Sequence, residues 1–325
     1  MVKKIEQNSS AADRPVFRSN AWTWIVALVL FTGAVTSVLY IRKDSLFGVR
    51  GPELRNEVQI TNDGFPKAGL VADRTRLFFT QHSSQGWSLV QKPLTAGSST
   101  TILPSSIADP KILDTSPDSE LLVSSGGAEQ KKSELWVVAG SGGVPRRLGI
   151  YSSVAAWAPD GKIVFSQGRD FYRAEHEGNH PVKFASALGP VSFLRVSPGG
   201  SRIRFTIGDP LVRTTMWEIQ SDGTGMTMLL PLPGGPGQPC CGNWTLDGKY
   251  FVYENSGDLW VVPANGSVTA KLNPPVQLTS GPRAYHNPVP GRDSRTLYVL
   301  GTMRPTAAGA ESGAQEIYAF ELRLP

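Results

Sequence analysis

Short apolar runs separated by tight turns fill most of the chain. Residues 243–266, NWTLDGKYFVYENSGDLWVVPANG, contain an apolar run, a turn, a second apolar run and another turn. Short runs rich in β-branched and aromatic residues, bounded by Gly, Pro, Asn and Asp, are typical of β-strands joined by hairpins. The 34 Gly and 25 Pro of the 325 residues fit the same description. The pattern therefore predicts an all-β structure with many strands.

This unit recurs six times along the chain. The aligned turn positions are Asp73, Asp118, Asp160, Gly199, Asp247 and Asp293. They are separated by 45, 42, 39, 48 and 46 residues, an average of 44. A four-stranded propeller blade takes about 40–50 residues. A strand with an aromatic residue follows each turn, as GWSLV (86–90), LWVV (135–138), FYRA (171–174), MWEI (216–219), LWVV (259–262) and IYAF (317–320). We therefore predict a six-bladed β-propeller over residues 56–325.

The two ends of the repeat array complement each other. The sixth unit stops after its aromatic strand, and the segment EVQIT (57–61) precedes the first unit without a partner. A closed ring leaves no exposed sheet edge. We predict that residues 58–61 pair with residues 316–320 and so complete the last blade. The alternative is an array that continues beyond residue 325.

Residues 19–41 form an uncharged stretch of 23 residues. A helix over residues 21–41 would span the roughly 30 Å hydrocarbon core of a bilayer. The alternatives are a cleaved signal peptide or a buried helix, but a signal peptide has a shorter apolar region. We predict a short cytoplasmic tail (1–20), a transmembrane helix (21–41), a linker (42–55) and the propeller.

The positive charge of the chain lies mainly at its N-terminal end. Residues 1–50 carry seven Lys/Arg and three Asp/Glu, whereas the remaining 275 residues carry 25 and 24. A nucleic-acid-binding domain concentrates positive charge on its folded surface. The composition therefore argues against direct nucleic-acid binding by this chain.

Two short motifs invite a chemical interpretation. HEGNH (176–180) matches the letters of a zinc-protease motif, which requires a helix, but Gly178-Asn179 occupies a predicted hairpin turn. We therefore predict no metal site there. Cys240 and Cys241 are the only cysteines and are adjacent. They are candidates for a redox-active vicinal disulfide, a soft-metal pair or two packed thiols.

No pattern in the chain identifies a catalytic centre. The sequence contains no GxSxG elbow, no P-loop and no GxGxxG fingerprint. Carboxylates that could line a channel are Asp109, Asp114, Glu175, Asp209 and Glu218. Turns and strand surfaces use the same residue types, and no pair among them is singled out. We expect no cofactor.

The repeats resemble the TolB-like (WD40-like) β-propeller family, with WAPDGKIVF (157–165) as the best match. The order of membrane segment, propeller and CCGNWTLDGKYFVY (240–253) is also similar to the sensor half of CadC-like membrane-bound transcriptional regulators. That resemblance implies a propeller in the periplasm, tethered to the inner membrane. Those regulators carry a winged-helix domain before the membrane segment, and only 20 residues precede it here.

The expected function is that of a non-enzymatic binding or sensing module for a protein, peptide or glycan. One alternative is the sensor part of a regulator whose DNA-binding domain is missing from this chain. A second alternative is a propeller hydrolase or lyase. Partner contacts are expected at the channel mouth or in the irregular segments 231–242 and 301–315, because loops on a rigid scaffold commonly carry function.

Overall fold

The computed structural model describes residue 30 and residues 52–102, 107–126, 133–209, 213–230, 237–264, 274–305 and 313–325. The chain divides into two compact units, Met1–Arg50 and Gly51–Pro325. The predicted tail and transmembrane segment, apart from Leu30, lie outside the described residues. Within the described part, no helix has both the length and the apolar character needed to cross a membrane.

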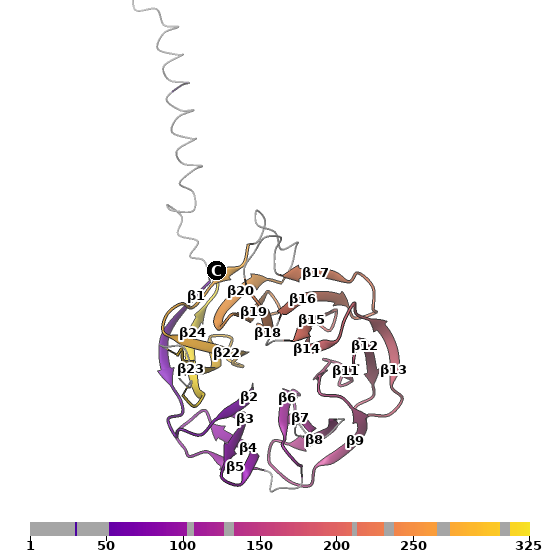
Figure 1. Ribbon diagram of the computed structural model, residues 1–325, viewed down its shortest axis with the longest axis horizontal. Coiled ribbons are helices and arrows are strands. Elements are labelled where there is room, and N and C mark those ends of the chain that lie inside the picture. The colour runs from indigo at the N-terminus through magenta and orange to yellow at the C-terminus, as the bar shows by residue number, and fades with distance from the viewer. Residues whose placement is uncertain are drawn as a thin grey trace, which may run out of the picture. The chain divides into compact units, whose positions relative to one another are not determined.

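Residues 53–323 form six antiparallel sheets of four strands each, arranged in a ring (Figure 1). The predicted six-bladed propeller is confirmed. Blades 1–3 are β2 (Lys67–Ala72), β3 (Arg76–Ser83), β4 (Gly86–Pro93) and β5 (Thr100–Thr101); β6 (Lys111–Thr115), β7 (Glu120–Ser125), β8 (Glu134–Ala139) and β9 (Arg146–Tyr151); and β10 (Ala155–Trp157), β11 (Ile163–Gln167), β12 (Asp170–Ala174) and β13 (Val182–Ser186).

The other three blades have the same strand order. They are β14 (Val191–Val196), β15 (Arg202–Asp209), β16 (Arg213–Gln220) and β17 (Thr227–Leu230); β18 (Pro239–Trp244), β19 (Tyr250–Asn255), β20 (Asp258–Pro263) and β21 (Val276–Gln277); and β22 (Arg283–Pro290), β23 (Thr296–Met303), β24 (Glu316–Arg323) and β1 (Glu53–Gln59). The first strand of each blade, namely β2, β6, β10, β14, β18 or β22, lies nearest the ring axis (Figure 1).

The repeated Asp-Gly turns connect the first and second strands of the blades. In the turn of residues 245–250, Asp247 Oδ1 accepts hydrogen bonds from the Lys249 N–H (3.0 Å) and from Thr245 Oγ1 (2.6 Å). Gly248 has a φ of +66°, a conformation that glycine adopts without steric cost. Gly161 and Gly200 have positive φ at the equivalent positions. The repeated turn motif therefore follows directly from local backbone chemistry.

Apolar packing joins each blade to the next. The described residues form six buried hydrophobic clusters, and each cluster takes residues from two neighbouring blades. Between blades 2 and 3, for example, Leu122 and Leu135 pack with Ile163 and Phe165, all at most 1% exposed. The aromatic strands recognised in the sequence are the third strands of their blades. Side chains on both faces of each sheet thus form the buried core between the blades.

The first and last strands of the propeller, β1 and β24, meet in the sixth blade, as predicted. β1 pairs antiparallel with β24, with Val58 opposite Ala319 and Gln59 opposite Tyr318. The Ile60 N–H extends the ladder by donating to the Ile317 carbonyl (2.8 Å). β1 begins at Glu53, three residues before the start predicted for the propeller, and a register irregularity lies between Arg55 and Val58. Glu53–Arg55 pair with Glu321–Arg323 on the far side of that irregularity and so extend the strand beyond the EVQIT segment.

A buried polar network fastens this closure. Lys67 Nζ, whose side chain is fully buried, lies 2.8 Å from Glu316 Oε2 and 2.5 Å from Asp63 Oδ1. Glu316 also accepts hydrogen bonds from Thr61 Oγ1 (2.5 Å) and from the Gly64 N–H (2.7 Å). The network joins the segment after β1 to the last strand and to the first blade. It therefore holds three parts of the chain together at the point where the ring closes.

Candidate binding site in the central channel

The six inner strands surround a central channel, and five of them carry a β-bulge. One extra residue interrupts the ladder of β2 between Ala68 and Leu70, and β6, β14, β18 and β22 have equivalent irregularities. Bulges bend a strand and increase its twist. Few residues in the sequence indicate these bulges. Only three of the five bulges contain a residue with positive φ, namely Gly69, Cys241 and Asn287, and Cys is not a residue type typical of that conformation.

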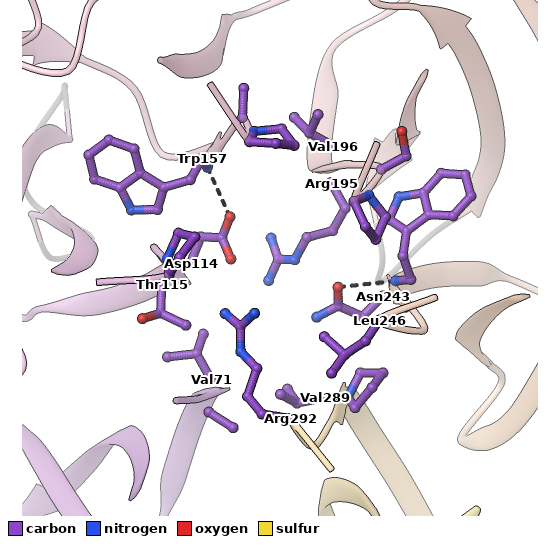
Figure 2. A pocket seen from close by; sticks show the side chains of 18 residues that line it. Val71, Asp114, Thr115, Trp157, Arg195, Val196, Asn243, Leu246, Val289 and Arg292 are labelled. Atoms are coloured by element: carbon purple, nitrogen blue, oxygen red, sulfur yellow. Dashed lines mark hydrogen bonds between the residues drawn. The ribbon is translucent and has the colours of Figure 1, made fainter. Parts of the chain in front are cut away.

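The end of the channel beside the Asp-Gly turns contains a cavity of about 230 Å³, which we call the turn mouth. Every blade contributes to its lining (Figure 2). Four prolines, Pro117, Pro159, Pro198 and Pro290, belong to this lining, together with Leu246. The residues flanking the repeated turns thus shape the cavity in addition to reversing the chain.

Three charged side chains point toward one another in the turn mouth: Asp114, Arg195 and Arg292 (Figure 2). Asp114 Oδ2 accepts a hydrogen bond from the Trp157 N–H (2.9 Å), which fixes the carboxylate against blade 3. Burial raises the pKa of Asp114, while the charges of Arg195 and Arg292 act in the opposite direction. With two cations and one anion, the cavity carries a net positive charge.

Arg195 lies at the narrow centre of the channel and is only 6% exposed. Its Nη1 donates to the Leu194 carbonyl (3.0 Å), and its guanidinium stacks 4.5 Å from the Phe193 ring centre. Its buried Nε has no hydrogen-bond partner among the described residues. Burial lowers the pKa of Arg195, and the charge of Asp114 opposes that effect. A buried donor without an acceptor costs free energy unless a ligand satisfies it.

The opposite end of the channel contains a second cavity, of about 170 Å³, which we call the bulge mouth. Its lining includes one residue from each of the five bulges: Gly69, Leu113, Ser192, Cys241 and Asn287. Arg195 lines this cavity as well as the turn mouth. Arg195 therefore contributes to the walls of both cavities, and its guanidinium points into the turn mouth (Figure 2).

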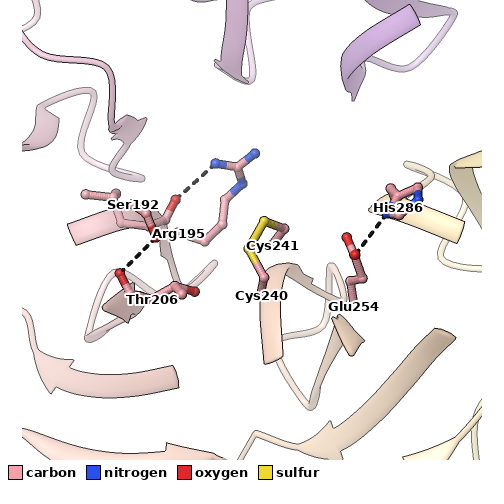
Figure 3. The surroundings of a disulfide bond; sticks show 8 residues. Ser192, Arg195, Thr206, Cys240, Cys241, Glu254 and His286 are labelled. Carbon is pink, nitrogen blue, oxygen red and sulfur yellow. Dashed lines mark hydrogen bonds and ion pairs between the residues drawn. A yellow bond between two sulfur atoms is a disulfide. The ribbon is translucent and has the colours of Figure 1, made fainter. Parts of the chain in front are cut away.

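Cys240 and Cys241 form a disulfide between adjacent residues (Figure 3). Of the three alternatives left open by the sequence, the structure contains the vicinal disulfide. Cys240 is buried (4% exposed), whereas Cys241 lines the bulge mouth with a φ of +48°. Their redox role remains a prediction. On the same face of the ring, His286 Nδ1 lies 2.9 Å from Glu254 (Figure 3).

The HEGNH segment is a turn, as predicted. It lies between β12 and β13, where the Gly178 N–H donates to the Glu175 carbonyl (2.8 Å). His176 Nε2 lies 2.6 Å from Glu120 of blade 2, and its ring stacks on Trp157 at 5.1 Å. Among the described residues, no group of three or more His, Cys, Asp or Glu side chains could hold a metal ion. His176 thus links blades 2 and 3.

This contact predicts a pH-dependent contribution to stability. Glu177 and Glu120 raise the pKa of His176, although burial and Arg146 act in the opposite direction. Because the folded-state pKa exceeds the unfolded value of about 6.5, the stabilisation is complete below that pH and disappears as pH rises through the folded pKa. His176→Asn should therefore lower the free energy of unfolding at pH 5.5 and change it by less than about 0.5 kcal/mol at pH 8.5.

Urea unfolding at the two pH values measures this effect. His180→Asn is the matched control, because His180 lies in the same turn with a φ of +52°, which asparagine tolerates. An equal loss from His176→Asn at both pH values would show that ring packing, and not the charge, stabilises the contact.

The other carboxylates considered in the sequence lie apart from one another. Of the four whose side chains are described, only Asp114 lines the turn mouth. Asp109 lines a separate hollow beside His82 and Trp87. Glu175 pairs with Lys162 (2.9 Å), and Glu218 pairs with Arg204 (2.7 Å). The side chain of Asp209 lies outside the described residues.

Sequence reasoning missed Arg195, Arg292 and Lys111 as channel residues. A signal was nevertheless present, since Asp114, Arg195 and Asn243 each stand four residues before the turn position of their unit. The equivalent residues of the other units are Gly69, Ala156 and Val289. Polar residues at this repeat position reach the channel, because the inner strand runs directly into the turn.

Comparison with known proteins identifies the fold. No family model matches the chain, and no curated protein matches it. Among solved structures, TolB from Agrobacterium tumefaciens is 15% identical with a TM-score of 0.52, over 66% of this chain and 80% of that one. A gluconolactonase from Xanthomonas campestris is 12% identical with a TM-score of 0.59, over 84% and 95%.

An oligogalacturonate lyase in complex with manganese is 14% identical with a TM-score of 0.54, over 82% of this chain and 93% of that one. Identities this low show similarity of fold alone. The chain therefore has a TolB-like six-bladed β-propeller fold, one shared by proteins with and without enzymatic activity.

Proposed function

We propose that this chain is a membrane-anchored binding or sensing module. Its turn mouth would receive an acidic group of a partner polypeptide. The observation that carries the proposal is the pair of guanidinium groups, Arg195 and Arg292, facing one cavity that also contains Asp114. Guanidinium groups bind carboxylates through two parallel hydrogen bonds.

A polypeptide fits the cavity better than a free small anion. The rim is apolar, with four prolines and Leu246 around the charged centre. Prolines are rigid and lose little conformational entropy when a ligand packs against them. An extended segment could therefore place a carboxylate on the guanidinium groups while its neighbouring residues contact the rim. Carboxyl termini and Asp or Glu side chains have the required chemistry.

The membrane anchor of this proposal rests on the uncharged stretch at residues 19–41. A tethered propeller would present the turn mouth to partners outside the inner membrane. The resemblance to CadC-like sensors supports the same arrangement, with DNA binding assigned to another chain or segment. The alternative of a hydrolase or lyase is tested by the experiment below.

The test uses full-length protein in neutral detergent and an array of synthetic peptides. Each peptide is made in two forms, one with Asp, Glu and a free carboxyl terminus, the other with Asn, Gln and a terminal amide. We expect the acidic forms alone to bind. Arg292→Glu should weaken binding at least about tenfold, because a charge-assisted hydrogen bond contributes roughly 1.5–3 kcal/mol.

Arg295→Glu is the matched control, since it introduces the same charge change in the same turn and Arg295 does not line the cavity. The proposal fails if no acidic peptide binds, or if both variants lose binding equally. Turnover of a lactone or an oligouronate by the wild type, abolished by Asp114→Asn, would favour the enzyme alternative.

A further inference from the structure

The bulge mouth differs from the turn mouth in its charge. Its described lining contains Lys111 and Arg195 and no carboxylate. Lys111 is the first residue of β6 and is exposed to solvent, although neighbouring protein atoms partly desolvate its ammonium group. This desolvation and the charge of Arg195 lower the pKa of Lys111. The two cations in this cavity repel each other, although Arg195 also faces Asp114 in the turn mouth. An anion placed between them would relieve that repulsion.

The remaining lining offers polar atoms without negative charge. Ser153 and Ser192 carry hydroxyl groups, and the side chain of Asn287 spans to blade 1 by donating to the Leu70 carbonyl (2.9 Å). Cys241 contributes a disulfide sulfur, which carries no charge. A free thiol at this place would ionise more readily, because nearby cations lower the pKa of a thiol. Apart from Lys111 and Arg195, the described lining residues of the bulge mouth are therefore uncharged.

The size of the cavity limits the ligand. A volume of about 170 Å³ has room for roughly 11–17 water molecules, at about 10–15 Å³ for each. A small oxyanion such as phosphate, or a short carboxylate, has this size. A folded partner or a long peptide does not.

We propose that the bulge mouth is a second ligand site, which binds a small oxyanion between Lys111 and Arg195. This site is separate from the turn mouth, since Lys111 does not line the turn mouth and Arg292 does not line the bulge mouth. Arg195, which lines both cavities, offers its donors to either ligand. The chemistry is shared by inorganic phosphate, phosphate esters and small carboxylates.

Isothermal titration of inorganic phosphate into the full-length protein at low ionic strength tests the proposal. Lys111→Gln should weaken phosphate binding at least about tenfold, because it removes one of the two cations. Arg292→Gln should leave the phosphate affinity unchanged. Lys183→Gln, on outer strand β13, is the charge-matched control and should have no effect.

Unchanged affinity in Lys111→Gln, or no binding by the wild type, would overturn the proposal. Loss of affinity in Arg292→Gln with none in Lys111→Gln would also overturn it, since phosphate would then occupy the turn mouth. Failure of the peptide test in the preceding section leaves this result unaffected, because the two experiments use different ligands and different variants.

Discussion

Glu316→Ala is expected to lower the free energy of unfolding by about 3–5 kcal/mol. The substitution removes the buried carboxylate that lies 2.8 Å from the fully buried ammonium group of Lys67 and leaves that ammonium with the partly exposed Asp63. Breaking a buried ion pair in this way is strongly destabilising. The substitution also removes the acceptor for Thr61 Oγ1 and for the Gly64 N–H. Because these groups close the ring, the loss should affect the whole propeller cooperatively.

Chemical denaturation of the variant and the wild type measures this loss. Glu321→Ala is the matched control, because Glu321 lies on the same strand in an exposed ion pair with Arg323. Exposed pairs contribute about 0–1 kcal/mol. A similar small loss from Glu316→Ala would mean that Asp63 compensates for the missing carboxylate and that the network does not hold the ring closed.

Arg195→Met is expected to weaken ligand binding at both mouths while preserving the fold. Binding of acidic peptides at the turn mouth and of phosphate at the bulge mouth should each weaken at least about tenfold, since both cavities lose a charged donor. The free energy of unfolding should change by less than about 1 kcal/mol. The apolar side chain removes a buried charge together with its unsatisfied Nε, and Asp114 keeps its hydrogen bond from the Trp157 N–H and the charge of Arg292 nearby.

Peptide and phosphate titrations, together with urea unfolding of the same variant, check both parts of this expectation. Arg204→Met serves as the comparison. Arg204 is also buried, but it pairs with Glu218 at 2.7 Å and stacks on Trp244 at 4.4 Å, so its loss should destabilise the protein by several kcal/mol. If Arg195→Met is equally destabilising and binds both ligands normally, Arg195 has a structural role.

The fold could be predicted because the blade repeat is local. An Asp-Gly turn and an aromatic third strand each depend on a few consecutive residues, and both recur at a blade-sized spacing. The pairing of β1 with β24 also followed from the pattern, since one strand was missing at one end and one was in excess at the other. β1 begins before the EVQIT segment that the sequence singled out, because Glu53–Arg55 also pair with the last strand beyond the irregularity between Arg55 and Val58.

The candidate site could be predicted only in part. Cys240 and Cys241 were recognised as a pair, but the cations at the channel centre come from different blades and have no common spacing in the sequence. Arg195 in VSFLRVSPGG looks like an ordinary strand residue. Its role depends on the bulges and on ring closure, which bring it opposite Asp114 of another blade. Such convergence is a property of the closed ring and not of any single repeat.

Arg195 and Arg292 converge on the turn mouth, and we propose that an anionic group of a partner binds them there. The decisive measurement is a crystal structure of the protein with an acidic peptide identified on the array. We predict a peptide carboxylate in the turn mouth within hydrogen-bond distance of the Arg195 guanidinium, with Arg292 on its other side. A peptide bound elsewhere, with the Arg195 guanidinium paired to Asp114 and no contact to the ligand, would show that the two guanidinium groups do not form the binding site.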